Sequence, residues 1–482
     1  MANIYNALNK HDLEKFFNLI AENILQSNLS LFLGAGSSMQ YDAMNWNELI
    51  NKVYKGCADW ENIERAQYAE LKGIDVKNTI AEVIKSVSID DKKINTFLHH
   101  LLNFDYKSLW TTNYDCVIEK VLIKKIKKYL SIYKYEHFKN LSCPGGNFLF
   151  KINGSCDSPE TIVITREDFI DYRKSHEAYL ILLKRELLRN SFLFLGCSFD
   201  DDILRICIKD ILNCIDNSSE NYITNHYAII AEQNVEKLDF ISEDLTKHYK
   251  INCLQINNIQ NAYITAYGIS SKVKLNSIFI SGAKAFVRYS TEEEYGKKVC
   301  QSLVNAFMKI KGFPFKFISG MGMSIGHFVS GTIKQLCKEK NINRYLRMEP
   351  FPFTSDEANE QHRESLINKA GVFIFIFGDF DGIKSNLKSN GMWREYLGAK
   401  NDKNNIIIPL PCSKDSVSYV IFEDEIKDEK TFSSKYKSLL QNFNYQDNND
   451  NFFDELVEKV VLETRKNMDK ILDEIINKLI HK

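Results

Sequence analysis

The segment LSLFLGAGSS, residues 29–38, decides the fold of the N-terminal part of this chain. Its first five residues are largely apolar, as in a buried parallel strand, and Gly34 and Gly36 follow directly. A glycine turn at the end of a strand lets the backbone approach a phosphate and present its amide donors. Tight strand-to-helix turns also use glycine for steric reasons alone. The motif by itself is therefore only weak support for a nucleotide site.

Short apolar runs of the same kind recur along the chain in two series. The first series holds residues 29–33, 108–111, 148–152, 191–195 and 227–230, and the second holds residues 277–280, 315–318, 372–377 and 406–409. Each run is followed by glycine or polar residues and then by a helical pattern, which is typical of parallel strands in an α/β sheet. We therefore predict an α/β protein with two Rossmann-like parallel-sheet domains.

The domain boundary is expected after a polar stretch, NNIQN at residues 257–261. A helix-to-linker transition ends near residue 276, and we predict domains at residues 1–272 and 273–482. A chain of 482 residues is also longer than one hydrophobic core usually serves. The last thirty residues space apolar side chains three and four apart, which predicts amphipathic helices. Such helices either dock on their own domain or form a dimer seam.

The bulk composition excludes several classes of partner. The net charge is −1, from 62 basic and 63 acidic residues, so no overall field attracts nucleic acid or an anionic membrane. The first residues lack the apolar core of a signal peptide, and we expect a cytoplasmic protein. The eleven cysteines form no CxxC pair, which favours buried reduced thiols and no bound metal.

Three further strand ends carry polar motifs. They read WTTNYD at residues 110–115, KINGS at residues 151–155 and LGCSFD at residues 195–200. Open α/β sheets place their ligands at the carboxyl ends of strands, so these motifs and the glycine turn should meet around one ligand. The predicted binding residues are Gly34, Ala35, Gly36, Ser38, Asn113, Gly196 and Ser198.

The motifs GAGxS, TTNYD, KxxGS and GxSFD, in this order, resemble those of the sirtuin-like NAD-cleaving domains of bacterial antiphage effectors. The resemblance covers residues 15–265. It implies that NAD+ is the substrate and that Asn113 and Asp115 bind and orient the nicotinamide ribose. Breaking the nicotinamide bond creates oxocarbenium-like charge, which hydrogen bonds and a nearby carboxylate stabilise.

Two positions depart from the family pattern. The family motif KxHG supplies a histidine suited to act as a general base, and this chain has Asn153 there. Asparagine binds a hydroxyl but cannot take its proton, so this is either a natural variant with weak or altered hydrolysis or a chain altered to trap an inactive state. Asp42 stands where the family often has glycine, near the expected path of the cofactor phosphates. We expect its carboxylate to turn outward or to be paired.

The C-terminal motifs are SGA at residues 281–283, SGMGMSIGH at 319–327, MEPFP at 348–352, Arg363 and WRE at 393–395. They resemble those of SLOG domains, over residues 277–480. A sirtuin-like domain followed by a SLOG domain resembles the effectors of Thoeris antiphage systems. In that family the SLOG pocket binds a cyclic ADP-ribose isomer, made by a TIR-domain partner enzyme, and thereby switches on NAD+ cleavage.

Carried over by motif, Ser281, Gly282, Gly320 and Gly322 would border the phosphates of the signal. Arg363 would donate to those phosphates, and Glu395 would accept from a ribose hydroxyl. Relatives carry basic residues at the positions of Glu349 and Phe380, and Arg344, Arg347 or Lys384 are the candidates to replace them here.

The leading hypothesis is an antiphage defence effector that hydrolyses NAD+ to nicotinamide and ADP-ribose when its SLOG domain binds the signal. The resemblance implies a homo-oligomer, either a tetramer or a filament. The alternative is a non-catalytic sensor or scaffold that binds NAD or ADP-ribose, which Asn153 favours. A third reading, a protein deacylase, is disfavoured because the chain lacks the zinc-binding insert with paired CxxC motifs.

Overall fold

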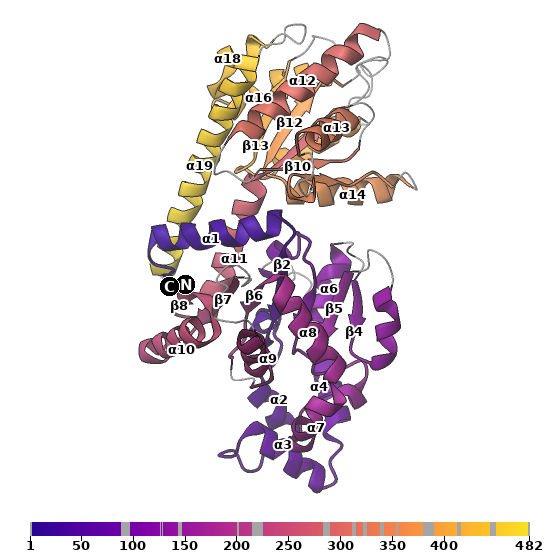
Figure 1. Cartoon of the computed structure of the whole chain (residues 1–482), viewed down its shortest axis with the longest axis vertical. Coiled ribbons are helices and arrows are strands. Elements are labelled where there is room, and N and C mark those ends of the chain that lie inside the picture. Colours follow the sequence, from indigo (N-terminus) through magenta and orange to yellow (C-terminus); the bar gives the residue numbers. More distant parts are fainter. Residues whose placement is uncertain are drawn as a thin grey trace. The chain divides into compact units, whose positions relative to one another are not determined.

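The computed structural model describes residues 2–87, 97–125, 127, 129–142, 147–199, 202–214, 225–282, 290–310, 315–321, 325–337, 342–352, 355–378, 390–411, 416–443 and 450–480. The chain divides into two compact units. The first comprises Met1–Ile24, Asn28–Tyr267 and Ile475–Lys482, and the second comprises Leu25–Ser27 and Gly268–Glu474. Figure 1 shows both units and labels many of their elements.

The N-terminal unit contains an eight-stranded sheet in the order β1-β8-β7-β6-β2-β3-β5-β4, with every neighbouring pair parallel. Its strands are β1 (Ile4–Asn6), β2 (Leu29–Leu33), β3 (Leu109–Thr111), β4 (Tyr129–Ile132), β5 (Asn147–Lys151), β6 (Ser191–Leu195), β7 (His226–Ala231) and β8 (Ile251–Ile256). Strand β2, which precedes the first glycine turn, lies between β3 and β6, and all five of its residues are buried. The strand order switches direction there, which is where open sheets bind ligands.

Helices connect these strands along the chain, and the last of them, α11, continues into the second unit from Gly268. They are α1 (Lys10–Leu25), α2 (Trp46–Val53), α3 (Asn62–Leu71), α4 (Val76–Ser86), α5 (Phe97–Leu101), α6 (Val117–Lys124), α7 (Arg166–Ser175), α8 (Glu177–Arg189), α9 (Asp202–Cys214), α10 (Val235–Tyr249) and α11 (Ile259–Leu275). Capping boxes begin two of them, with Asn45 before α2 and Thr165 before α7. In the core, the rings of Trp110 and Phe150 stack with centroids 4.2 Å apart, which fixes β3 against β5.

The C-terminal unit contains a five-stranded parallel sheet in the order β11-β10-β9-β12-β13. Its strands are β9 (Ser277–Ser281), β10 (Lys316–Ser319), β11 (Leu346–Met348), β12 (Val372–Ile376) and β13 (Ile406–Leu410). Its helices are α12 (Ser290–Lys309), α13 (Ile325–Cys337), α14 (Asp356–Lys369), α15 (Gly391–Lys400), α16 (Val417–Glu425), α17 (Phe432–Lys435), α18 (Lys437–Gln441) and α19 (Asp450–Ile480). Phe453, Leu456 and Val460 of α19 belong to the core of this unit, so the first half of the terminal helix docks on its own sheet domain.

The predicted fold class, two α/β domains with parallel sheets, is confirmed. Four strands, β1, β4, β8 and β11, were not predicted, and three of these are edge strands. In place of the expected linker near residue 276, α11 continues to Leu275 and β9 begins at Ser277. Among the residues that the structure describes, no helix has the length and apolar character to cross a membrane.

Candidate active site

Two glycine turns meet at the centre of the N-terminal sheet. The first follows β2 as a short 3₁₀ turn (Ala35–Ser37), and the second follows β6 at Gly196. The Gly36 N–H donates to the Gly196 carbonyl over 3.0 Å. Gly196 has φ +68°, a conformation that other residues rarely adopt. The two turns are therefore packed backbone on backbone, as the glycines in both motifs allow.

These turns open onto a cavity of about 1450 Å³ in the N-terminal unit. Every residue that the sequence nominated for the NAD site lines it: Gly34, Ala35, Gly36, Ser38, Asn113, Asp115, Asn153, Gly196 and Ser198. They come from the carboxyl ends of β2, β3, β5 and β6, which the sheet order places side by side. The cavity exceeds the size of common small-ligand pockets and has room for a dinucleotide.

Asn113 is held by the first glycine turn. Its Nδ2 donates to the Gly34 carbonyl over 3.1 Å and to Ser38 Oγ over 3.0 Å, and its backbone N–H donates to Thr111 Oγ1. These bonds fix which way the amide points. Within the described residues, the buried Asn113 Oδ1 has no hydrogen-bond partner. An unpaired buried acceptor is costly, so this oxygen is suited to receive a hydroxyl from a ligand.

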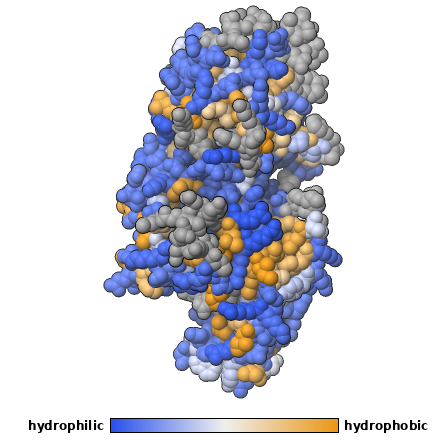
Figure 2. Space-filling view, in the orientation of Figure 1, coloured by the Kyte–Doolittle hydropathy of each residue, from blue (hydrophilic) through white to orange (hydrophobic). Residues whose placement is uncertain are grey.

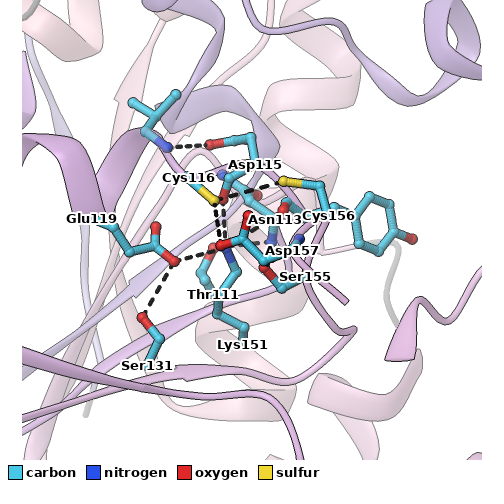
Figure 3. Close-up of polar contacts among 12 residues, drawn as sticks. Thr111, Asn113, Asp115, Cys116, Glu119, Ser131, Lys151, Ser155, Cys156 and Asp157 are labelled. Atoms are coloured by element: carbon cyan, nitrogen blue, oxygen red, sulfur yellow. Dashed lines mark hydrogen bonds and ion pairs between the residues drawn. The ribbon is translucent and has the colours of Figure 1, made fainter. Parts of the chain in front are cut away.

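Asp115 lies beside Asn113 and is anchored from below by a buried lysine (Figure 3). Asp115 Oδ1 accepts from Ser38 Oγ over 3.2 Å and from the Val117 N–H over 2.9 Å. Lys151 Nζ donates to the Asp115 carbonyl over 2.5 Å and to Glu119 Oε1 over 2.8 Å. Burial lowers the pKa of Lys151, but Glu119, Cys116 and Asp115 together outweigh this and the pKa is raised, so the lysine stays charged.

Lys151 is the first residue of the KxxGS motif, but the motif alone predicts no role for it. The structure makes it the residue that positions the Asn113–Asp115 loop through backbone carbonyls. The only sequence signal for this was a lysine at the end of a predicted strand, a position that usually faces solvent.

Asn153 follows β5 and is also buried. Tyr172 Oη donates to its Oδ1 over 3.4 Å and to the Ile152 carbonyl over 3.0 Å. The Tyr172 ring stacks on His176, and burial lowers the pKa of His176 to about 4. None of the described residues that line the cavity is a histidine. The described part of the cavity wall therefore offers no imidazole to take over the proton transfer that Asn153 cannot perform.

A group of potential metal ligands lies next to these residues. The donor atoms of Cys116, Cys156 and Asp157 lie within 4.8 Å of one another (Figure 3). The positive charge of Lys151 acts on both thiols, and this charge disfavours a divalent cation at the cluster. The sequence did not foresee this cluster because its two cysteines are forty residues apart and match no metal-binding spacing.

Asp42 has the left-handed conformation, with φ 62° and ψ 17°. This explains why glycine suits the position, and aspartate is among the few other residues that tolerate it. Its side chain is exposed and does not line the cavity.

In the C-terminal unit, Ser281, Arg363 and Glu395 come together. Ser281 Oγ donates to Glu395 Oε2 over 2.5 Å, and Arg363 Nε lies 3.5 Å from Glu395 Oε1. Burial raises the pKa of Glu395, and the hydrogen bond from Ser281 and the charge of Arg363 oppose this rise. Arg363 also donates to Glu360. The guanidinium group of Arg363, which was predicted to bind phosphate, therefore contacts two carboxylates, those of Glu360 and Glu395.

The glycines of the predicted signal site lie at neighbouring strand ends, Gly282 after β9 and Gly320 after β10. Gly322 lies outside the described residues, as do Phe380 and Lys384. Glu349 binds Lys369 Nζ at 2.7 and 2.8 Å and also pairs with Arg347, so Arg347 is already engaged. A shallow cavity of about 590 Å³ between α12 and α13 contains none of the predicted signal residues.

Comparisons with known proteins agree with this two-part architecture. A model of SIR2-like domains matches residues 107–254, and a model of the Sir2- and TIR-associating SLOG family matches residues 266–467. The NAD(+) hydrolase ThsA of Enterococcus faecium is 26% identical over 445 residues, which cover 87% of this chain and 91% of that protein. The protein of the same name from Bacillus cereus is 24% identical over 82% of this chain and 86% of its own length. The defense-associated sirtuin 2 of Bacillus subtilis is 24% identical over 38% of this chain and 19% of its own length.

Proposed function

We propose that this chain is an antiphage effector that hydrolyses NAD+. It matches a SIR2-like domain followed by a Sir2- and TIR-associating SLOG domain, and over most of its length it is similar to proteins named NAD(+) hydrolase ThsA. Residues 1–272 would form the NAD+-cleaving domain and residues 273–482 the sensor domain. The products would be nicotinamide and ADP-ribose. Depletion of NAD+ would then stop the infected cell from supporting phage growth.

One observation carries the proposal: four strand-end loops converge on a cavity of about 1450 Å³ that contains the unpaired acceptor Asn113 Oδ1. The N–H groups of the Gly34–Gly36 turn would face the pyrophosphate, as amides at such turns do. Asn113 would accept from the nicotinamide ribose. The Asp115 carboxylate would stabilise the positive charge that develops on the ribose as nicotinamide leaves.

Because Asn153 cannot act as a general base, it lowers the rate of NAD+ hydrolysis that we expect. Without a base, an attacking water must lose its proton to solvent or to a carboxylate, and the loss of general base catalysis costs about a hundredfold to ten-thousandfold in rate. We therefore expect slow hydrolysis by the chain with Asn153. The Tyr172 hydrogen bond would hold the asparagine close to the ribose and leave binding intact.

The sensor site would be the Ser281, Arg363 and Glu395 cluster, with Gly282, Gly320 and Gly322 beside the phosphates. A cyclic ADP-ribose isomer from a TIR-domain enzyme would take the Arg363 donors away from Glu360. The signal can switch on NAD+ cleavage only if it binds the active arrangement more tightly than the resting one.

A homo-oligomer would provide those two arrangements. The N-terminal unit bears apolar patches on the face seen in Figure 2, and Ile181 and Leu188 of its helix α8 are exposed. Contiguous apolar patches of this kind mark interaction sites when they are large.

The absence of histidine from the described cavity wall favours a second candidate, a sensor that binds NAD or ADP-ribose without cleaving it. Both candidates require NAD+ binding, and only the first requires turnover.

Nicotinamide release separates the two candidates. The assay would compare the chain with Asn153→His, each with and without a panel of cyclic ADP-ribose isomers, and with the double variant Asn113→Ala/Asn153→His as the matched control. We expect signal-dependent release that rises at least about a hundredfold in Asn153→His and disappears in the double variant. If neither the unchanged chain nor Asn153→His releases nicotinamide, while calorimetry shows that both bind NAD+, the binding sensor is the supported function.

A further inference from the structure

Two cysteines at the cavity wall take no part in the chemistry described so far. Cys116 Sγ and Cys156 Sγ lie 3.6 Å apart (Figure 3). Cys116 directly follows Asp115, and Cys156 lies three residues beyond Asn153. The Cys156 N–H donates to the Tyr114 carbonyl over 2.9 Å, so the backbones of the two loops are already joined at this point. The thiol pair thus bridges the loops that carry Asp115 and Asn153.

The surroundings shift the pKa values of the two thiols in opposite directions. The hydrogen bond from Cys116 lowers the pKa of Cys156, and the Lys151 charge acts in the same direction against the effect of burial. The same hydrogen bond raises the pKa of Cys116, and burial adds to this. The two sulfurs lie 3.6 Å apart on the cavity wall, so one thiol can attack an oxidant and the other can resolve the product; the lowered pKa favours Cys156 as the attacking thiol.

We propose that Cys116 and Cys156 are a redox pair, in which peroxide forms a reversible intramolecular disulfide that closes the NAD+ site. Its effect on NAD+ rests on the proposed function, whereas formation of the disulfide does not. Both cysteines line the cavity, so a small oxidant that enters the cavity reaches them.

The reaction balances in two steps. The Cys156 thiolate attacks one oxygen of hydrogen peroxide, the O–O bond breaks, and hydroxide leaves Cys156 as a sulfenic acid. The Cys116 sulfur then attacks the Cys156 sulfur, the S–O bond breaks, and water leaves with the Cys116 proton. The two sulfurs lose two electrons, and peroxide is reduced to two molecules of water once the hydroxide is protonated. A small dithiol reverses the reaction by thiol–disulfide exchange.

The disulfide would disturb the site because it must shorten the distance between the sulfurs. A disulfide has its sulfurs about 2.05 Å apart, so Cys116 and Cys156 must approach by roughly 1.5 Å. Asp115 moves with Cys116, and its bonds to Ser38 and Val117 set where its carboxylate lies. A displacement of about 1 Å in such a site can cost roughly a hundredfold in rate. We expect NAD+ affinity to fall at least about tenfold on oxidation.

The test treats the full chain with hydrogen peroxide and follows it by peptide mass mapping and NAD+ calorimetry. We expect a Cys116–Cys156 cross-linked peptide, weaker NAD+ binding, and recovery of both with dithiothreitol. Cys57→Ser, which removes a half-buried thiol outside the cavity wall, should behave like the unchanged chain. Cys116→Ser should stop at a Cys156 sulfenic acid that dimedone traps, and Cys156→Ser should form neither product.

Absence of the cross-linked peptide, or a cross-link that leaves NAD+ affinity unchanged, would overturn the proposal. Thermal melting of each variant shows whether it is folded, so a failure to react is not confused with unfolding. If the reduced chain does not bind NAD+ at all, the proposed function is wrong, and the cross-linked peptide still decides whether the two cysteines are a redox pair.

Discussion

A Cβ atom placed on Gly34 would lie 2.4 Å from the carbonyl oxygen of Gly196. The turns after β2 and β6 lie so close together that neither Gly34 nor Gly196 can carry a side chain without a shift of the backbone. Both glycines line the cavity. We predict that Gly34→Ala lowers the free energy of unfolding by about 1–3 kcal/mol, because the backbone must shift to relieve the overlap. Its NAD+ affinity should fall as well.

Chemical denaturation and calorimetry measure these two effects. The matched control is Gly331→Ala in α13, where an added Cβ meets nothing within 4 Å. That change should be neutral or stabilising by about 0.5–1 kcal/mol, since alanine suits a helix better than glycine. Equal stability of Gly34→Ala and the unchanged chain would contradict the packing argument.

Asn113→Asp tests the orientation of the amide. The substitution keeps the shape but replaces Nδ2, which donates to Gly34 and Ser38, with an oxygen that the Gly34 carbonyl repels. We expect NAD+ affinity to fall at least about tenfold and the free energy of unfolding to drop by about 1–3 kcal/mol. Asn234→Asp makes the same chemical change at an exposed helix cap, where aspartate is equally suitable, and should alter neither quantity. Calorimetric NAD+ titration would show whether the two variants differ.

Glu349 makes stability depend on acid pH. Burial alone raises its pKa, but the charges of Arg347 and Lys369 lower the pKa from 4.5 to about 2. Because the folded value is the lower one, the pairing contributes stability above about pH 4.5, and this contribution is lost as the pH falls through about 2. The shift corresponds to about 3 kcal/mol at neutral pH.

Glu349→Gln should remove most of this acid dependence, while Glu364→Gln, an exposed change on α14, should leave it in place. Unfolding free energies between pH 5 and pH 2 give the comparison. Parallel curves for the unchanged chain and Glu349→Gln would show that the ion pairs contribute nothing to stability.

Arg363→Lys tests the sensor site. Lysine keeps the positive charge but loses the planar fork that can bind a phosphate while contacting Glu395. We expect affinity for a cyclic ADP-ribose isomer to fall roughly tenfold to a hundredfold, with NAD+ affinity unchanged. Arg465→Lys, an exposed change on α19, should bind the isomer normally. Isothermal titration with the isomer decides, and unchanged affinity in Arg363→Lys would place the signal elsewhere.

Much of the fold could be predicted because buried parallel strands are nearly continuous apolar runs. Those of β2 and β6 were predicted with the bounds that the structure has. The missed strands lacked that signal for physical reasons. At the sheet edges, β4 is only partly buried, and β11 has only three residues, of which the first is buried and the last is exposed. The sequence does not predict the buried β8 because its INCLQI segment mixes polar residues into the apolar run and leads into the polar stretch at residues 257–261.

The sequence by itself determined the class of fold and the polar residues that follow each strand. Strand ends and glycine turns are local features, since they depend on neighbouring residues along the chain. Only the tertiary structure decided which of these residues meet. The positioning of Asp115 by Lys151, the contact of Arg363 with Glu395, and the 3.6 Å approach of Cys116 to Cys156 each join residues from different elements. Such contacts follow from strand order and loop path, which local sequence patterns do not encode.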